Sequence, residues 1–257
     1  MAELSTYPRG AEWRQWDLHI HSPASFHWDG ARFDADPNAS ENTLLIDQMI
    51  EALNSAAPAV YALMDYWTFD GWFALKKRLA QKGAPKLEKV VFPGIELRLM
   101  APMDGRLNAH VIFSDSTPDQ ILLDFKSALT VELINSPLSN HALIELARKK
   151  VGEDKLKHHG FIKSEVDSND ATALRAGSTI AEINCDSYKR ALERIPQGSA
   201  VGFMPFSTSD GLDEIKWQEH YAYVLGLFNS SPIFETRNSD LWAAFAGVRT
   251  AKNAKWL

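Results

Sequence analysis

Residues 59–83, AVYALMDYWTFDGWFALKKRLAQKG, contain the pattern that decides the fold class. The first six residues form a short apolar run, which predicts a buried strand. From Asp70 onward, apolar side chains recur at helical spacing as far as Leu79, and Gly83 follows at a position that suits a helix C-cap. The stretch therefore predicts a β/α unit, in which a strand leads directly into a helix.

The same alternation recurs along the chain. Strand-like apolar runs lie at Trp16–Ile20, Ala59–Met64, Lys89–Phe92 with a continuation at Ile95–Met100, Asn108–Phe113, Val201–Phe206 and Ile233–Thr236. Amphipathic helical patterns lie at residues 40–56, 70–83, 117–129, 139–150, 178–195 and 211–228. The alternation predicts an α/β protein of layered or barrel architecture rather than a sandwich or a helix bundle.

The length and regularity of the chain predict one domain. A chain of 257 residues with 45% hydrophobic residues can bury one large α/β core, and no Pro-rich or Gly/Ser-rich linker divides it. We therefore expect residues 1–257 to form a single domain. Residues 151–178 are polar and poorly periodic, and we expect an insertion or mobile loop there.

Charge and cysteine content limit the compartment and the partners. The net charge of −6 gives no bulk electrostatic attraction to nucleic acid, although a local contact stays open. The single cysteine, Cys185, excludes an internal disulfide and fits a reducing compartment. No leader pattern is visible and no run approaches the roughly 18 apolar residues of a membrane helix. We expect a cytoplasmic protein with no membrane partner.

The stretch WDLHIHSPAS, residues 16–25, is the first candidate site segment. In an extended strand alternate residues point to one side, so Asp17, His19 and His21 are predicted to project together. Two imidazoles can then share one cation. With eight histidines in 257 residues, an H-x-H occurs by chance in about one shuffled sequence in five, so the pair alone is a weak signal.

Three further side chains follow predicted strands. Asp65 and Glu96 come at or near the ends of apolar runs, and His110 opens the next run after a predicted hairpin turn. Each also has a structural interpretation, as a turn carboxylate, an exposed strand residue or a packing histidine. Two neighbouring strands could nevertheless bring Glu96 and His110 together. A set of three histidines and a glutamate suits Zn²⁺, Mn²⁺ or Fe²⁺ rather than Ca²⁺.

Four segments, taken in order, resemble one protein family. They are WDLHIHSPAS, YALMDYWTFDG, FPGIEL and AHVIF, between Trp13 and Phe113, and they resemble the polymerase and histidinol phosphatase (PHP) family of metal-dependent phosphoesterases. The first segment also resembles the start of large bacterial proteins in which a PHP domain precedes an SMC-like ATPase. No G-x-x-x-x-G-K-[ST] loop occurs in this sequence, so an ATPase domain or subunit is an expected partner outside it.

The resemblance implies a distorted (β/α)7-type PHP barrel with metal ions at the carboxyl ends of its strands. It implies that His19 and His21 hold a first metal, that Glu96 bridges two metals, and that His110 binds the second. The expected cofactors are divalent ions, Mn, Zn or Fe, two in number. The function that follows is phosphoester hydrolysis by a metal-activated water, of the phosphatase or nuclease type. The substrate is then a phosphorylated small molecule or a nucleic acid.

The two aspartates have less defined roles. The resemblance places Asp65 at a third metal position. Asp17 or Asp65 is expected to orient an imidazole or to complete a coordination shell.

The sequence also departs from the family. The second motif, usually Asp-His, reads Asp65-Tyr66, and a tyrosine with an ordinary pKa near 10 is a poor ligand at neutral pH. Pro205 or Ser207 stands where a later ligand is expected, and the closing Asp-x-His motif is missing, so the barrel is expected to be incomplete at its C-terminus. The alternative function is a catalytically degenerate PHP-like domain that serves as a regulatory or interaction module of an ATPase-linked system.

Overall fold

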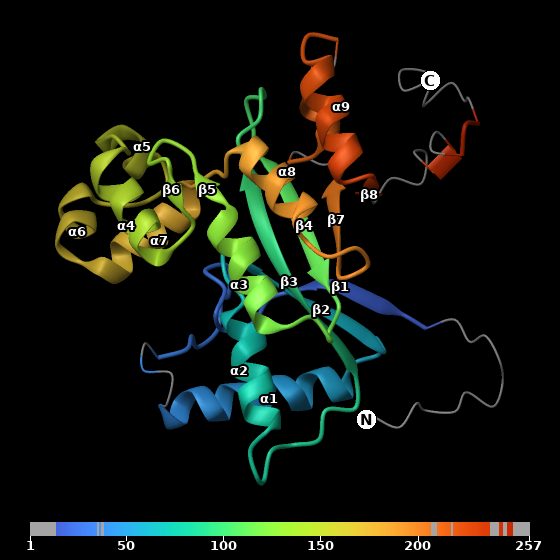
Figure 1. Cartoon of the computed structure of the whole chain (residues 1–257). Coiled ribbons are helices and arrows are strands. Elements are labelled where there is room, and N and C mark those ends of the chain that lie inside the picture. Colours follow the sequence, from blue (N-terminus) through green and yellow to red (C-terminus); the bar gives the residue numbers. More distant parts are fainter. Residues whose placement is uncertain are drawn as a thin grey trace.

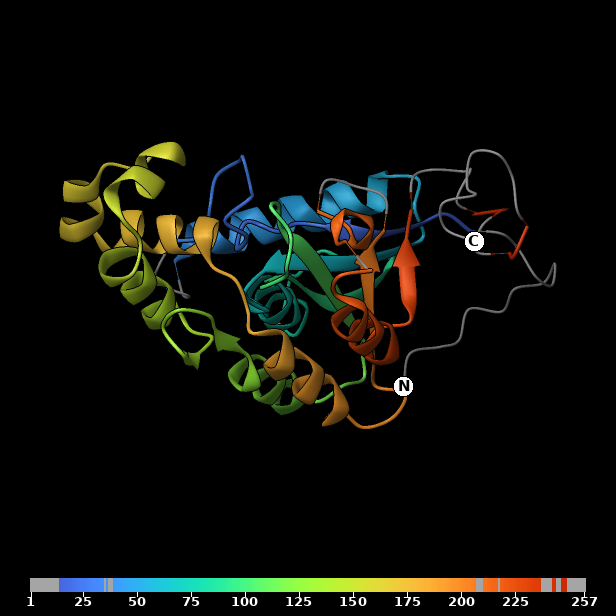
Figure 2. The same cartoon turned by 90° about the horizontal axis from the view of Figure 1, so that it is seen from above.

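The computed structural model describes residues 14–34, 36, 39–206, 210–216, 218–236, 242–243 and 246–248. Its centre is a six-stranded mixed sheet in the order β1-β2-β3-β4-β7-β8, curled into a half-barrel with helices packed around it (Figure 1, Figure 2). The predicted α/β class and distorted barrel are confirmed. Trp13 and Ser207, which the sequence analysis singled out, lie outside the described residues.

All six strands of the main sheet occur where apolar runs predict them. They are β1 (Trp16–Ile20), β2 (Val60–Tyr66), β3 (Val90–Leu99), β4 (Leu107–Phe113), β7 (Ala200–Pro205) and β8 (Ile233–Glu235). The two runs around Pro93 form one continuous strand. The two-residue strands β5 (Thr130–Val131) and β6 (Ser136–Pro137) pair separately and are too short to predict.

Within the main sheet, β4 runs in the opposite direction to its two neighbours. β1, β2 and β3 are mutually parallel, β4 runs antiparallel to both β3 and β7, and β8 is parallel to β7. The predicted hairpin between β3 and β4 is confirmed. Because β4 returns directly along β3, Glu96 lies opposite His110 across the ladder.

Most predicted helices are present, some with shifted bounds. They are α1 (Ser40–Ser55), α2 (Asp70–Leu79), α3 (Asp119–Ala128), α4 (Asn140–Lys149), α8 (Cys185–Glu193) and α9 (Tyr221–Ser230), with a 3-10 turn at Leu212–Glu214. The helix expected at 178–195 begins only at Cys185, because Ile183 is extended and bridges to Leu99. Among the described residues, the structure has no helix of the length and apolarity that a membrane crossing requires.

The segment 151–178 is helical, so the expected loop is wrong. It contains α5 (Glu153–His158), α6 (Lys163–Ser168) and α7 (Asp170–Ile180), which gather with α4 in a lobe beside the sheet (Figure 1). α5 and α6 are only one to two turns long and each buries a single apolar residue, which is too little for a visible periodicity. That the segment is an insertion stays a prediction.

The lobe depends on one close helix contact, which gives a testable prediction. A Cβ added at Gly177 in α7 would lie 2.0 Å from the backbone oxygen of Leu143 in α4. We expect Gly177→Ala to lower the free energy of unfolding by about 1–3 kcal/mol, because two backbones must separate. Urea unfolding measures the change, and Gly152→Ala is the control because a Cβ there meets no heavy atom within 4 Å. Equal stability of Gly177→Ala and wild type would contradict the contact.

Alternation along the strands gives the sheet two chemically different faces. One face packs fully buried apolar side chains such as Leu63, Ile95 and Val111 into the main core beneath the helices. The concave face carries a smaller apolar cluster of Ala62, Met64, Ile112 and Phe203, with Leu18 and Phe92 packed against it. The residues that follow Met64 and precede Ile112 on this concave face are polar, and they form the candidate site.

Candidate metal centre

One row of side chains crosses the concave face at the level of the site. Tyr66, Glu96, His110 and Phe203 are successive ladder partners on β2, β3, β4 and β7. Each strand thus contributes one residue to a line perpendicular to the strands. Because ladder partners on one face have their side chains adjacent, this register brings residues from distant parts of the chain into contact.

A pocket of about 240 Å³ opens over this row. This space is large enough for metal ions and a phosphate group. Its lining consists of His19, His21, His27, Tyr66, Glu96, Asn108, His110, Pro205, Asp210 and Glu235.

A β-bulge in β1 turns both histidines of the first motif into the pocket. The register with β2 shifts between Asp17 and Ile20. As a result, Leu18 packs in the concave-face cluster whereas Ile20 packs against the main core, and His19 and His21 both line the pocket. Simple alternation predicted Leu18 and Ile20 on the same side. The extra residue of the bulge breaks that alternation.

The bulge also removes Asp17 from the predicted group. Its carboxylate accepts a hydrogen bond from the backbone N–H of His19 at 3.3 Å, and Asp17 lies opposite Tyr61, whose side chain is in the main core. Asp17 is not among the residues that line the pocket. The structure places the Asp17 carboxylate beside the backbone of the bulge rather than among the residues that line the pocket, and its predicted role in orienting an imidazole stays a prediction.

Glu96 lies at the centre of the cluster and is 2% exposed. Its Oε2 is 3.0 Å from Nε2 of His19 and 3.6 Å from Nε2 of His21, while its Oε1 is 3.5 Å from Nε2 of His110. Burial alone would raise the pKa of Glu96, but the close approach of His110 and His19 outweighs burial and holds that pKa well below its usual range. The carboxylate is therefore ionised, with one oxygen toward each side of the cluster.

His19 in β1 and His21 just after that strand differ in the charge that they carry at neutral pH. Burial acts to lower the pKa of His19, but its bond with Glu96 leaves that pKa above the ordinary value. Burial lowers the pKa of His21 to about 4, because the attraction of Glu96 only partly offsets it and His19 and His27 repel a further charge. His21 is thus neutral at pH 7 and has a free lone pair, which metal coordination requires.

His110 shows the clearest unmet bonding capacity. The residue is 2% exposed, its ring stacks on Phe203 with centroids 4.8 Å apart, and within the described part of the chain neither ring nitrogen has a hydrogen-bond partner. Leaving a buried polar group unsatisfied costs about 1–3 kcal/mol. A cation between His110 and the neighbouring carboxylates would satisfy one nitrogen, so the donor set fits a divalent metal.

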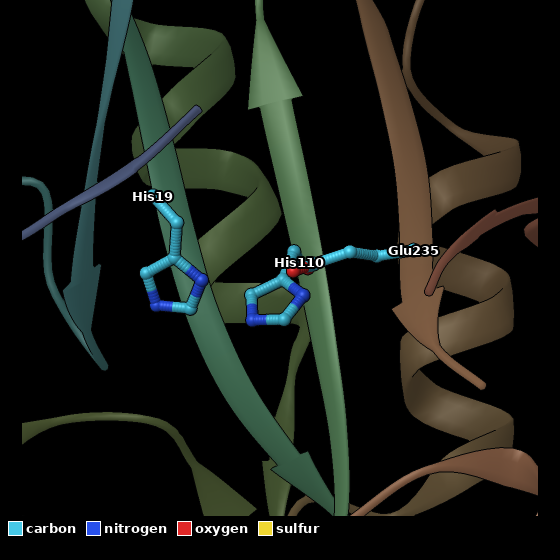
Figure 3. A group of neighbouring side chains, drawn as sticks. All are labelled: His19, His110 and Glu235. Carbon is cyan, nitrogen blue, oxygen red and sulfur yellow. The ribbon is translucent and has the colours of Figure 1, made fainter. Parts of the chain in front are cut away.

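Glu235 is a member of the cluster that the sequence analysis missed. Ligand atoms of His19, His110 and Glu235 all lie within 4.8 Å of one another, as do those of His19, His21 and Glu96. Figure 3 shows the Glu235 side chain reaching from β8 toward the ring of His110, with His19 alongside. Glu235 ends a predicted strand, so the strand-end reasoning applied to Glu96 could have found it.

Tyr66 and Asn108 form another part of the pocket wall. The Nδ2 of Asn108 donates to Glu96 Oε1 at 2.9 Å, to Asp210 Oδ2 at 2.9 Å and to the Tyr66 hydroxyl oxygen at 3.2 Å. Burial and the nearby charge of Glu96 raise the pKa of Tyr66, so it is a neutral phenol. Asn108 thus fixes the orientation of Glu96. The sequence analysis could have found Asn108, because it lies two positions before His110 on the same face of β4.

Asp65 lies on the opposite face of β2, adjacent to the main core. Its carboxylate accepts hydrogen bonds from the backbone N–H of Ser22 at 2.7 Å and from the Ser22 hydroxyl at 2.6 Å, and it is almost fully buried. The structure does not bring Asp65 into the histidine cluster, since neighbouring strand residues point to opposite faces, and its role at a third metal position stays a prediction. Asp65 instead holds the segment that directly follows His21.

The burial of Asp65 predicts a stability that falls as pH rises. Burial raises the pKa of Asp65 to about 6, with the Ser22 bonds opposing it. The acid form is favoured on folding, so its contribution is fully present below the unfolded pKa of about 3.9 and is lost as pH rises through 6. We expect Asp65→Asn, which cannot ionise, to gain up to about 3 kcal/mol over wild type between pH 4 and pH 7.5. Urea unfolding at both pH values measures this gain.

The control for this prediction is Asp115→Asn, which removes an exposed carboxylate. Asp115→Asn should follow wild type at both pH values. A constant difference between Asp65→Asn and wild type across this range would contradict the raised pKa.

Comparisons with known proteins do not assign a function, so the functional argument depends on the site itself. No protein-family model matches the sequence, and no curated protein matches it. A solved amidohydrolase from Chromobacterium violaceum, with bound sulfate and no metal, is similar at a TM-score of 0.47 and 15% identity, over 91% of this chain and 84% of that chain. A protein from Bifidobacterium adolescentis described as a metal-dependent phosphoesterase is similar at a TM-score of 0.38 and 12% identity, over 82% and 74%.

Proposed function

We propose that this protein is a metal-dependent phosphoester hydrolase of the PHP type. The observation that carries the proposal is the buried, ionised Glu96, with one oxygen facing His19 and His21 and the other facing His110. A carboxylate between two sets of imidazoles is an arrangement that suits two divalent ions. In the proposal His19, His21 and Glu96 hold one ion, and Glu96, His110 and Glu235 hold the other.

The protein residues supply binding and orientation for this chemistry. Bound divalent ions lower the pKa of a coordinated water and polarise the phosphoryl oxygens of a substrate. Asn108 keeps Glu96 turned toward His19 and His21 on one side and His110 on the other, and the Phe203 ring stacks on His110 and supports it. Nitrogen and carboxylate ligands together favour Mn²⁺, Zn²⁺ or Fe²⁺ over Ca²⁺.

A second candidate is a PHP-like module that binds metal without turnover. Tyr66 supports it, because a neutral phenol stands where the resembled family carries an imidazole, and Asn108 already bonds both to the phenol and to Glu96. A third ion therefore has fewer ligands than in the resembled family. In this candidate the domain regulates or recruits an ATPase domain or subunit.

A phosphate-release assay decides between the two candidates. Protein stripped with EDTA is supplied with Mn²⁺ and given p-nitrophenyl phosphate, and separately a single-stranded oligonucleotide to detect nuclease activity. The hydrolase predicts metal-dependent product that disappears in the double variant His19→Ala with His21→Ala. His141→Ala is the control, since His141 is an exposed residue of α4. Bound metal with no product from any substrate would favour the module, and activity in the double variant would refute the assigned site.

A further inference from the structure

A buried arginine stands beside the metal cluster without a carboxylate partner. Arg98 is 4% exposed and lies on β3, two residues beyond Glu96 on the concave face. Its guanidinium covers the Tyr66 ring at 4.7 Å, donates to the backbone oxygen of Thr179 at 2.7 Å, and lies 3.3 Å from His27 Nε2. In the described part of the chain no acid forms an ion pair with Arg98. A buried charge without a counter-ion is costly, so it needs an explanation.

A second arginine lies next to it across the β3–β4 hairpin. Asn108 pairs with Arg98 in the ladder, and Arg106 precedes Asn108 by two residues, which places Arg106 on the same face, diagonal to Arg98. Burial and then repulsion by Arg98 lower the pKa of Arg106. Within the described ranges Arg106 has no hydrogen bond or ion pair. The hairpin thus holds two like charges together.

The helical lobe contributes to the same region. Burial lowers the pKa of His159, and repulsion by Arg106, His158 and Lys155 adds to that effect. His159 and Lys155 belong to α5 and its C-cap, and the lobe contacts Arg98 directly through the backbone oxygen of Thr179 in α7. Burial raises the pKa of Glu182, although Lys155 and Arg106 attract its charged form. Glu182 therefore balances part of the positive charge of Arg106 and Lys155.

We propose that Arg98, Arg106, Lys155 and His159, the basic cluster, bind a second phosphate group of the substrate. This inference rests on the proposed function, in which the metal pocket takes the first phosphate. In that function the ions and the first phosphate occupy the metal pocket, and the basic cluster lies beside the pocket wall, where a second phosphate of the same substrate could bind. Arg98 connects the two places, since it contacts His27 and Tyr66 in the pocket wall.

The chemistry of the cluster suits a phosphate. A guanidinium presents its N–H groups as a planar fork that matches phosphate oxygens. The side chains of Arg106, which is partly exposed, and Lys155, which is exposed, have no hydrogen bond or ion pair within the described residues, so their donors are available to such a ligand. Arg98 is too buried to reach far, and its part is to raise the local positive potential. The second phosphate belongs either to a nucleotide chain or to a small bisphosphate.

Binding in the absence of metal tests the cluster separately from catalysis. Isothermal titration in EDTA compares glucose 1,6-bisphosphate with glucose 6-phosphate, and the 5′-phosphorylated dinucleotide pdTdT with thymidine 5′-monophosphate. We expect wild type to bind one of the doubly phosphorylated probes about tenfold more tightly than its partner, as one charge-assisted contact supplies. The pair that shows the difference identifies the substrate type. Raised salt should shrink the difference.

Two variants make the result specific. Arg106→Gln and Lys155→Gln should each reduce the tenfold preference to less than about threefold, whereas Arg194→Gln, which changes an exposed arginine at the end of α8, should keep it. Equal binding of both members of each pair by wild type, or an unchanged preference in Arg106→Gln, would overturn the proposal. Because no metal is present, either result leaves the hydrolase assay as an independent test.

Discussion

Replacing Glu96 by Gln is expected to reduce phosphoester hydrolysis by more than about 100-fold and to lower the metal content from two ions per chain to one or none. Altering an outer partner of a metal ligand already costs about 10–100-fold, and the direct loss of a shared carboxylate costs more. The amide keeps the size of Glu96 but loses its charge, so the two groups of histidines no longer face a common anion. Steady-state kinetics with Mn²⁺ and elemental analysis after dialysis measure both effects.

The matched control is Glu88→Gln. Glu88 is exposed and lies just before β3, so the same chemical change occurs near the same strand but away from the pocket. We expect wild-type activity and metal content from this variant. Full metal content in Glu96→Gln would show that the carboxylate does not bridge ions.

Saturating one metal site is expected to raise the melting temperature of wild type by about 8–16 °C, and a second occupied site adds to this shift. At a free concentration of 1,000 times Kd, one site adds about 4 kcal/mol to the free energy of unfolding. About 2–4 °C per kcal/mol is typical of a chain of this size. The gain arises where His110 has unsatisfied ring nitrogens, because coordination supplies the bond that the protein itself does not. Thermal unfolding with and without Mn²⁺ measures the shift.

His110→Phe separates this effect from general stabilisation. Phenylalanine retains the stacking on Phe203 and removes two buried nitrogens that have no hydrogen-bond partner among the described residues, but it also removes the approach of His110 to Glu96 at 3.5 Å, so without metal the variant should be close to wild type in stability. With metal, its melting temperature should rise by less than half of the wild-type shift. An equal shift in His110→Phe and wild type would mean that the stabilising ion binds elsewhere.

The strands of the main sheet were predictable because buried strands appear in the sequence as runs of apolar residues. β2 and β4 are buried along their whole length, so neither depends on a subtle alternation. The hairpin that reverses β4 was also visible in the turn residues after β3. His19, His21, Glu96 and His110 come together as the sequence analysis expected, since strand-end positions converge in such a sheet.

What the sequence analysis misplaced depends on single-residue geometry. The bulge in β1 arises from the way β1 pairs with β2, and the residues around Asp17 contain no sequence pattern that predicts it. Asp65 and Tyr66 are neighbours, so only the register with β3 tells which one faces the pocket. The lobe of α5 and α6 is stabilised by packing against longer helices, and its short segments lack a period of their own.

The location of bound metal tests the central claim most directly. Crystals of the protein grown or soaked with Mn²⁺ are measured at the manganese absorption edge. We predict two anomalous peaks per chain on either side of Glu96, one beside His19 and His21 and the other beside His110 and Glu235. The absence of any peak within coordinating distance of Glu96, in protein saturated with the ion, would contradict the account.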